Sequence, residues 1–402
     1  MRITRSIALG ASAVVGLSLA LTGCAGSTGS AGGDASADPV KMCVLVSDAT
    51  SSEALGFKDY YTEYVQENFP VEFVYSDELA DADAEKSAME NFIANNCKAV
   101  ISFASADRPA QIEMAEDAGV YYAVATGTLS DEDYETYKDY EYYVGAIGPS
   151  LDIEFQAGYD MAQFFVEEGD TSFGLFGAGI PYYLDMHIHR TAGILAALAE
   201  EPSTTYGGQK DPGAILGKIY QDGTIKIADF ESDVYSLTGY LEAWNFSDSA
   251  WQANMAGMVA AQPDAILAAG TGFAVVGAAV AGTDIKIGDI DAYTEDNKAA
   301  MESGALAYLA GKFTSINGPI FAATLSAVQG EPLRADGDAA IALGQGYWVA
   351  TSIEEFDQIL AADSVESPVY DKTALEPWIA SGATYDDFAT FVSQYTYADL
   401  VG

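Results

Sequence analysis

The chain has 402 residues, half of them apolar and 12% aromatic, so it can bury the cores of two ordinary domains. Its 60 Asp and Glu residues outnumber 17 Lys and Arg residues, which gives a formal charge of −43 at pH 7. Such a surface repels phosphate backbones and anionic lipid, which argues against nucleic-acid binding. Because no D-x-D-x-D-G calcium loop occurs, we interpret the acidic residues as a heavily solvated surface.

The first 24 residues, MRITRSIALGASAVVGLSLALTGC, have the layout of an export signal. Arg2 and Arg5 precede an apolar run of 15 residues, Ile7–Leu21, which is shorter than the roughly 20 residues of a membrane-spanning helix. Leu21-Thr-Gly-Cys24 closes the run and resembles the lipobox of bacterial lipoproteins. We therefore expect residues 1–23 to be a signal peptide and Cys24 to carry lipid; the alternative is an ordinary signal peptide with a chance Cys.

The segment that follows supports the anchor. Ala25–Asp38 contains only Ala, Gly, Ser, Thr and Asp, so residues 24–39 are predicted to be a flexible tether with nothing to bury. A protein built this way is expected to be exported and held by lipid on the extracytoplasmic face of the cell membrane.

From Val40 onwards, short β-rich runs alternate with helical stretches. This βαβαβαβ pattern predicts a parallel sheet with helices on both faces. The expected strands are Val40–Val46, Val71–Tyr75, Ala99–Phe103 and Val120–Ala125, and the expected helices are Glu53–Asn68, Ala82–Asn95 and Pro109–Ala118.

The acidic, Tyr-rich stretch Asp131–Glu141 is expected to be a connector, after which the alternation starts again. Glu201–Asp222 is expected to be an inserted loop or small hairpin, and about 50 less regular residues follow the last strand. The expected strands are Tyr142–Ile147, Thr171–Phe176, Thr224–Phe230, Ala265–Ala269, Ile285–Ile290, Leu306–Leu309 and Tyr347–Ala350, and the expected helices are Leu151–Glu168, Leu184–Glu200, Ser249–Ala261, Phe273–Ala281, Asp296–Ser303 and Pro319–Gln329. The predicted fold class is therefore α/β, with two doubly wound parallel-sheet lobes joined by a hinge.

The cysteines test this fold. With Cys24 lipidated, Cys43 and Cys97 remain as one pair in an oxidising compartment. Strands one and three are neighbours in a doubly wound sheet of order 2-1-3-4, and the two cysteines lie at the same end of these strands. Strands about 5 Å apart bring the Cα atoms within bridging range, which predicts a disulfide; two buried thiols are the alternative.

Ligands of open parallel sheets bind beyond the carboxyl ends of the strands, so the expected site is the cleft between the two lobes. The strand ends select Asp48, residues 105–108, Thr126, residues 177–183, residues 244–246, Thr271 and residues 289–293. Only three arginines follow the leader, and two of them, Arg108 and Arg190, lie near these edges. Their forked donors suit a ligand; salt bridges to the abundant carboxylates are the alternative reading.

Three short stretches carry a family resemblance: Asp107-Arg108 after the third expected strand, Arg190-Thr-Ala-Gly193 in an expected helix, and Ile287-Gly-Asp-Ile-Asp291 at the end of an expected strand. On their order and spacing, Val40–Ala350 resembles the type I periplasmic substrate-binding proteins of the ribose/galactose kind. Asp107-Arg108 matches a family position that holds sugar hydroxyls, and Arg190-Thr-Ala-Gly193 matches an R-x-x-G whose Arg contacts ligand. Ile287-Gly-Asp-Ile-Asp291 matches a strand that ends in a sugar-binding Asp, for which we choose Asp291 over Asp289.

The resemblance implies a substrate-binding lipoprotein of an ABC importer that captures a small sugar and delivers it to membrane permease subunits. It implies a periplasmic-binding-protein-like I fold, with residues 40–130 and 313–345 in the N-terminal lobe and residues 140–310 and 346–402 in the C-terminal lobe. A solute-sensing receptor is an alternative role for the same fold.

Departures from the sugar-binding pattern leave a second ligand class open. Asp48-Ala-Thr-Ser-Ser52 replaces an aromatic pair, and Gly270-Thr-Gly272 replaces Asn-Asp. Together with Trp244-Asn-Phe-Ser-Asp248, this turn is similar to nucleoside-binding lipoproteins of the basic-membrane-protein group. Sugar and nucleobase would stack on the same rings. The predicted ligand-binding residues are Asp48, Asp107, Arg108, Tyr182, Arg190, Trp244, Thr271 and Asp291.

Catalysis is not expected. The only histidines, His187 and His189, lie two apart and point to different sides of a predicted helix, and no G-x-S-x-G elbow occurs. The same spacing does not suit zinc on a helix face. We therefore expect no enzyme activity, no metal and no cofactor.

Overall fold

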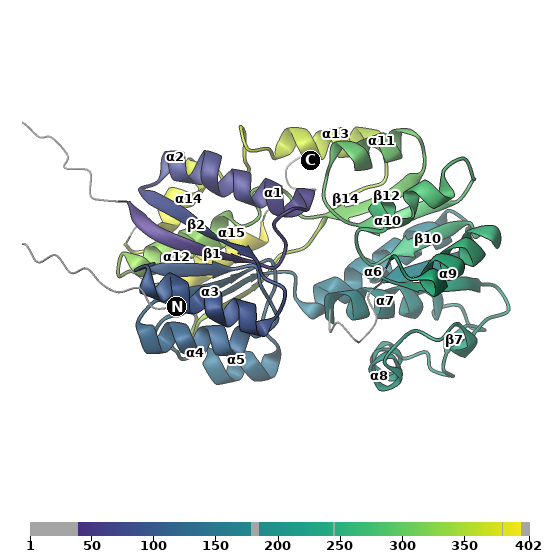
Figure 1. Cartoon of the computed structure of the whole chain (residues 1–402), viewed down its shortest axis with the longest axis horizontal. Helices are drawn as coiled ribbons and strands as arrows, with labels where there is room; N and C mark the ends of the chain where they lie inside the picture. The colour runs from purple at the N-terminus through teal and green to yellow at the C-terminus, as the bar shows by residue number, and fades with distance from the viewer. Residues whose placement is uncertain (1–38, 178–184, 244–245, 380, 395–402) are drawn as a thin grey trace, which may run out of the picture. The chain divides into compact units, whose positions relative to one another are not determined.

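The computed structural model describes residues 39–177, 185–243, 246–379 and 381–394. They form two six-stranded sheets with helices on both faces and one small two-stranded sheet (Figure 1). The predicted signal peptide, Cys24 and nearly all of the tether lie outside these residues. Within them, no helix combines the length and the apolar character that crossing a membrane requires.

The first sheet has the order β13-β5-β4-β3-β1-β2, and all of its pairings are parallel. Its strands are β1 (Val40–Val46), β2 (Val71–Glu78), β3 (Ala99–Ser102), β4 (Tyr121–Ala125), β5 (Tyr143–Gly148) and β13 (Ile341–Gly344). Its helices are α1 (Ser52–Asp59), which continues through a π-helical stretch (Tyr60–Val65) into α2 (Gln66–Asn68), and α3 (Ala82–Ala94), α4 (Arg108–Ala118), α5 (Asp131–Tyr137) and α12 (Gly318–Val328).

Both faces of this sheet are buried, which explains the unbroken apolar run of β1. Met42 and Val44 pack into the core under α1 and α12, while Cys43 and Leu45 pack into the core under α3 and α4. In Figure 1, α3, α4 and α5 lie on one side of the sheet and α1 and α2 on the other. The alternation of side chains along a strand thus supplies both cores.

The second sheet has the order β14-β12-β11-β10-β6-β9, and only β14 is antiparallel to its neighbour. Its strands are β6 (Ser172–Gly177), β9 (Ser236–Glu242), β10 (Ala265–Ala268), β11 (Lys286–Ile290), β12 (Leu306–Gly311) and β14 (Trp348–Ala350). Its helices are α6 (Leu151–Glu167), α7 (Asp185–Leu198), α9 (Ser249–Ala260), α10 (Gly272–Val280), α11 (Glu295–Glu302) and α13 (Ile353–Ala362). The predicted α/β fold with two parallel-sheet lobes is therefore confirmed.

Helices α6 and α7 cross at very short range because two glycines face the crossing. A Cβ on Gly158 would lie 1.9 Å from the carbonyl oxygen of Arg190, and one on Gly193 would lie 2.0 Å from that of Phe155. No larger residue fits at either position. This contact fixes where the Arg190 side chain emerges.

The boundary predicted between the lobes is wrong at β5. Residues 140–310 were expected to lie in the C-terminal lobe, but β5 pairs with β4 and β13 in the first sheet. The expected connector 131–141 contains helix α5, whose N-cap Ser130 accepts a bond from Asp133 N and whose first turn is acidic. A β4-α5-β5 unit therefore continues the first sheet, because an alternating pattern does not mark the sheet that a strand joins.

The segment 346–402 is also not confined to the C-terminal lobe. Strand β14 and helix α13 pack on the second sheet, whereas α14 (Lys372–Ile379) packs on α12 and α15 (Tyr385–Ser393) on β13. Tyr60 Oη donates to the carbonyl oxygen of Tyr370 at 2.6 Å, and this bond links the start of the tail to the first lobe. Within this C-terminal segment, the ring of Phe391 packs on the rings of Tyr370, Trp378 and Phe388.

A small subdomain interrupts the second sheet between α7 and β9. Helix α8 (Pro212–Asp222) has Asp211 as its N-cap and Gly223 as a left-handed end, and β7 (Thr205–Tyr206) pairs with β8 (Phe230–Glu231). The predicted sheet strand at 224–230 is wrong, because the strand that joins the sheet is β9. Within 224–230, Ile227–Asp229 form a short 3₁₀ turn instead.

Candidate ligand-binding site

Three cavities meet around the first turn of α1, and each is lined by two of the three residues Ser51, Ser52 and Glu53. We name them after one lining residue: the Arg108 cavity has a volume of about 200 Å³, the Asp291 cavity about 660 Å³ and the Asp363 cavity about 430 Å³. Their walls come from residues at or after the carboxyl ends of β1, β3, β4, β10, β11 and β12. This is the location expected for a ligand of open parallel sheets.

The Arg108 cavity contains four predicted strand-end residues. Asp48 follows β1, Ser105 and Arg108 follow β3, and Thr126 follows β4. The cavity is lined by Val46, Ser47, Asp48, Ser51, Glu53, Ala54, Phe57, Lys58, Tyr75, Phe103, Ser105, Arg108, Thr126, Met186 and Lys312.

Arg108 is held in the cavity by uncharged partners. Its Nε donates to the carbonyl oxygen of Ala104 at 3.3 Å, and Nη1 donates to that of Thr128 at 2.9 Å. The preceding loop is fixed by the buried Glu85, whose carboxylate accepts from the backbone N–H groups of Ala106 and Asp107 at 2.9 and 3.0 Å. The guanidinium is thus positioned without losing its charge to a carboxylate.

Asp107, which was predicted to bind ligand, caps a helix. Its carboxylate is the N-cap of α4 and accepts a bond from Ala110 N at 3.1 Å. It does not line any of the three cavities. Its predicted contact with a sugar stays a prediction.

Asp48 shapes the loop after β1. Its Oδ1 accepts from the backbone N–H groups of Thr50 and Ser51 at 2.8 and 3.0 Å. Partial burial alone would raise the pKa of this carboxyl, but the bonds from Ser51 and Thr50 outweigh it and leave the pKa below its usual value. Asp48 is therefore ionised and holds the turn that starts α1.

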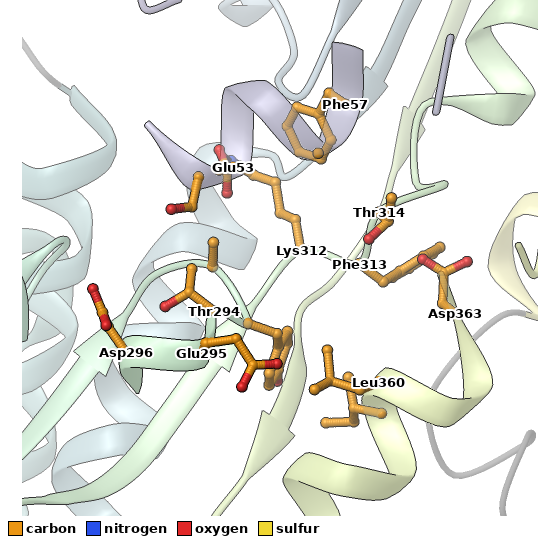
Figure 2. Close-up of a pocket in the computed structure, with 15 residues that line it drawn as sticks. Glu53, Phe57, Thr294, Glu295, Asp296, Lys312, Phe313, Thr314, Leu360 and Asp363 are labelled. Carbon is orange, nitrogen blue, oxygen red and sulfur yellow. Dashed lines mark hydrogen bonds and ion pairs between the residues drawn. The ribbon is translucent and has the colours of Figure 1, made fainter. Parts of the chain in front are cut away.

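Glu53 and Lys312 form an ion pair that was not predicted from the sequence. Lys312 Nζ lies 3.1 Å from Glu53 Oε1, and both residues line the Arg108 and Asp363 cavities (Figure 2). Glu53 lies in the first turn of α1, and Lys312 comes directly after β12. The position of Lys312 after a predicted strand, in a chain with only 12 lysines, could have marked it as a residue of the site.

The Asp363 cavity has an acidic wall, with Glu295, Asp296 and Asp363 among its lining residues (Figure 2). The carboxylate of Asp363 accepts from Ser315 N at 2.9 Å, from Ser315 Oγ at 2.6 Å and from Val369 N at 2.8 Å. Burial raises its pKa. Asp363 therefore joins the tail to the segment after Lys312.

The two carboxylates at the end of β11 have different surroundings. Asp291 lines the Asp291 cavity, while Asp289 is fully buried and accepts from Phe273 N at 2.8 Å at the start of α10. Burial, followed by the nearby Asp291, raises the pKa of Asp289 to about 7. Burial also raises the pKa of Asp291. The predicted choice of Asp291 as the cavity-facing residue agrees with this arrangement; its contact with ligand stays a prediction.

Two threonines adopt strained backbone conformations at strand ends. Thr126, after β4, has a φ of 57°, and Thr271, after β10, has a φ of 51°. Such a conformation is unusual for a β-branched residue, costs about 1–3 kcal/mol and tends to occur at functional sites. Thr126 lines the Arg108 cavity and Thr271 lines the Asp291 cavity.

Arg190 differs from Arg108 because its partner is a carboxylate. Its Nε lies 2.6 Å from Glu154 Oε2, Nη1 donates to the carbonyl oxygen of Ala269 at 2.6 Å, and Nη2 donates to Tyr347 Oη at 2.7 Å. Arg190 and Glu154 are both buried, and neither lines any of the three cavities. Burial disfavours the charge, but the attraction of Glu154 outweighs it and raises the pKa of Arg190.

The remaining predicted residues lie elsewhere. Tyr182 and Trp244 fall outside the described residues. His187 lies against Gly270, and burial together with Arg190 and Lys312 lowers its pKa to about 3, so the imidazole is neutral at physiological pH. Across the part of the chain that the structure describes, no group of three or more metal-ligating side chains occurs.

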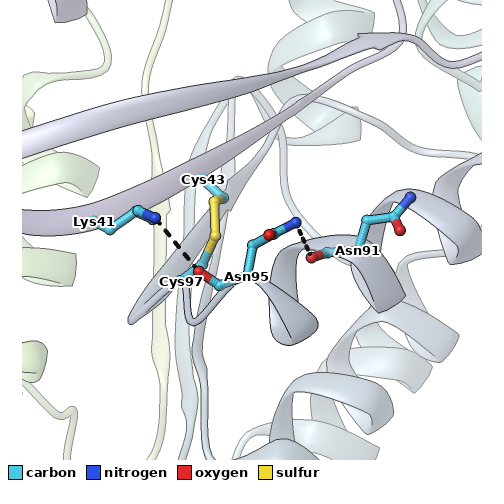
Figure 3. The surroundings of a disulfide bond; sticks show 5 residues. All are labelled: Lys41, Cys43, Asn91, Asn95 and Cys97. Carbon is cyan, nitrogen blue, oxygen red and sulfur yellow. Dashed lines mark hydrogen bonds between the residues drawn. A yellow bond between two sulfur atoms is a disulfide. The ribbon is translucent and has the colours of Figure 1, made fainter. Parts of the chain in front are cut away.

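The predicted disulfide between Cys43 and Cys97 is confirmed, with a Cα–Cα distance of 5.9 Å (Figure 3). It joins β1 to the turn before β3, and these strands are neighbours as predicted. By the chain-entropy estimate, closing a loop of 54 residues stabilises the fold by about 4 kcal/mol. Since the bridge joins the middle of β1 to the turn that precedes β3, it lies away from the carboxyl ends of the strands and supports the sheet rather than the cavities.

Known structures resemble this chain over about four fifths of its length. A solute-binding protein of an ABC transporter from Bacillus halodurans C-125, with bound myo-inositol, matches with a TM-score of 0.55 and 18% identity over 82% of this chain and 100% of that chain. The fold is that of the type I periplasmic binding proteins. The predicted resemblance is thereby confirmed for the fold.

Two further structures agree with the type I fold. A periplasmic solute-binding protein from Actinobacillus succinogenes 130z, with bound D-allose, gives a TM-score of 0.56 at 16% identity over 79% of this chain and 99% of that chain. A twin-arginine translocation pathway signal protein from Burkholderia phytofirmans gives a TM-score of 0.58 at 16% identity over 81% of this chain and 92% of that chain. No family model and no curated protein matches the sequence.

Proposed function

We propose that this chain is the solute-binding component of an ABC importer and that it captures a small sugar for delivery to membrane permease subunits. The observation that carries the proposal is the meeting of three cavities at the carboxyl ends of strands from both sheets. A solute there contacts both lobes at once. Binding stabilises the conformation in which those contacts are made, and that conformation is the one offered to the permease.

The neighbours support a sugar as the solute class. Two of the matched structures hold myo-inositol and D-allose, and a third is described as a galactofuranose-binding protein. The Arg108 cavity combines aromatic side chains with hydroxyl, carboxylate and cationic groups, which is the mixture that polyhydroxylated rings require. The proposed role is binding and not catalysis.

The proposal includes a lipid anchor at Cys24. Export and attachment to the outer face of the cell membrane would keep the binding protein beside its permease. Metabolic labelling with palmitate in the native host tests this part. The intact chain is expected to take up label and a Cys24→Ser variant to take up none; equal labelling of both would contradict the anchor.

A thermal-shift screen of monosaccharides and nucleosides tests the solute class. A ligand at 100 times its Kd stabilises the folded state by about 2.7 kcal/mol, which is a readily measured shift in Tm. The proposal expects a shift with at least one sugar. A shift with nucleosides alone would replace the sugar by the nucleoside alternative, and no shift with either class would contradict the proposal.

A further inference from the structure

We propose that the ligand is a monosaccharide acid, a sugar that carries one carboxylate such as a uronate or an aldonate. This inference rests on the proposed function and specifies its substrate class. It comes from the charges that line the Arg108 cavity.

Cations are concentrated in this cavity against the trend of the whole chain. Acidic residues outnumber basic ones by 60 to 17 in the sequence, yet the cavity is lined by three cations, Lys58, Arg108 and Lys312, and by two carboxylates, Asp48 and Glu53. The neighbouring Asp363 cavity shows the ordinary pattern, with four carboxylates and only Lys312 among its lining residues. Cationic side chains thus outnumber carboxylates in the Arg108 cavity, which is the opposite of the balance in the whole chain.

The carboxylates of the cavity are already engaged. Glu53 is paired with Lys312 at 3.1 Å, and Asp48 accepts two backbone N–H bonds in its own turn. Within the described residues neither carboxylate makes an ion pair with Arg108 or Lys58. With Glu53 paired to Lys312 and Asp48 ionised, the three cations and two carboxylates leave an excess of one positive charge in the cavity. Two cations therefore remain available for an anion from solution.

Arg108 and Lys58 make no ion pair within the described residues. Arg108 uses Nε and Nη1 on backbone carbonyl oxygens, which orient the guanidinium plane and leave its charge unbalanced. Lys58 Nζ lies 5.4 Å from the ring centroid of Tyr75, and this cation–π contact also keeps the charge. In a chain with a large excess of carboxylates, two unpaired cations at one small cavity indicate a partner that is not part of the chain.

The size and the walls of the cavity favour one sugar ring with a carboxylate. Its volume of about 200 Å³ is below the roughly 300–1,000 Å³ of pockets for drug-sized ligands, so it suits a single ring. Phe57 and Phe103, whose ring centroids lie 5.7 Å apart, supply an apolar surface for the C–H face of the ring. A carboxylate then accepts from the Arg108 fork, with Lys58 nearby.

Isothermal titration calorimetry of the full chain with matched pairs tests the inference. The pairs are glucuronate and glucose, galacturonate and galactose, and gluconate and glucitol. At least one acid is expected to bind ten times or more tighter than its neutral partner. Arg108→Gln and Lys58→Gln are each expected to reduce that preference at least threefold, whereas Lys86→Gln, which removes an exposed cation of α3 outside all three cavities, is expected to keep it.

The outcomes separate this inference from the proposed function. Neutral sugars that bind as tightly as the acids would overturn the inference and leave the proposed function standing. Tighter binding of glucose 6-phosphate than of glucuronate would overturn the inference that the recognised anion is a carboxylate. Binding of no sugar of either kind would overturn both. Because Lys58 is exposed, its variant is expected to fold even if the Arg108 variant does not.

Discussion

The two arginines that the sequence placed at the cleft edge have opposite surroundings. Arg190 lies in a buried crossing of two helices and is paired with Glu154 at 2.6 Å, while Arg108 lies at a cavity and is held by two carbonyl oxygens. A carboxylate partner balances the charge and makes the residue part of the core. Carbonyl partners fix the geometry and leave the charge for a ligand. The partner therefore decides the role more than the residue type or its distance from a strand end.

The largest expected effect is a loss of folding stability when Arg190 is replaced. Arg190→Gln leaves the carboxylate of Glu154 buried without a counter-ion, which typically costs about 3–5 kcal/mol. Urea unfolding should show this loss, and the double variant Glu154→Gln/Arg190→Gln should recover part of it. Unchanged stability of Arg190→Gln together with lost sugar binding would show that Arg190 acts on the ligand instead.

Arg108→Gln is the matched change on the other side. We expect the affinity for the best ligand to fall about tenfold or more, which corresponds to about 1.4 kcal/mol, while the free energy of unfolding changes by about 1 kcal/mol or less. The small effect on stability follows because only two bonds to carbonyl oxygens are lost. Calorimetry and urea unfolding on the same preparation measure both quantities, and a loss of stability larger than that of Arg190→Gln would invert the comparison.

The two strained threonines sharpen the comparison, because strain at a cavity indicates selection for binding. Thr126→Gly and Thr271→Gly should each stabilise the chain by about 1 kcal/mol, since glycine adopts a positive φ without the Cβ penalty, and should weaken binding. Gln262→Gly is the control, because Gln262 has a φ of 51° away from the three cavities. The Gln262→Gly variant should gain stability without losing affinity for the ligand. An equal loss of affinity in all three variants would show that the strain at Thr126 and Thr271 has no specific role in binding.

A smaller effect concerns the buried carboxyl of Asp289. Its pKa is raised from 3.8 to about 7 by burial and by Asp291, so between these pH values the folded state holds a proton that the unfolded state has lost. Its contribution to stability is thus complete below pH 3.8 and is lost as the pH rises to about 7. Relative to the wild type, Asp289→Asn should gain at least about 1 kcal/mol between pH 4 and pH 7. A pH-independent difference in unfolding free energy would show that Asp289 has an ordinary pKa in the folded chain.

Much of the fold was predictable because it depends on local patterns. Apolar runs such as β1 and their alternation with helices predicted parallel sheets, and the strand order that follows predicted the Cys43–Cys97 bridge. The assignment of β5 and of α14 and α15 to the first lobe was not predictable in this way. These elements are assigned by long-range pairing, which their own sequences do not record.

In the candidate site, too, features that follow from local sequence patterns were predictable and features that depend on distant residues were not. Parallel-sheet topology selected strand-end residues that line cavities, namely Asp48, Arg108, Thr271 and Asp291, and their contact with a ligand stays a prediction. It could not tell that Asp107 caps a helix or that Arg190 is buried with Glu154, because both facts depend on neighbours distant in sequence or on local cap geometry. The Glu53–Lys312 pair was missed for the same reason, since its partners are 259 residues apart.

A crystal structure of the chain with the best-binding sugar tests the central claim most directly. We predict that the sugar lies in the Arg108 cavity, within hydrogen-bond distance of Arg108, while Arg190 keeps its ion pair with Glu154. A sugar bonded to Arg190 with that ion pair broken, or a sugar bound away from the three cavities, would contradict the account.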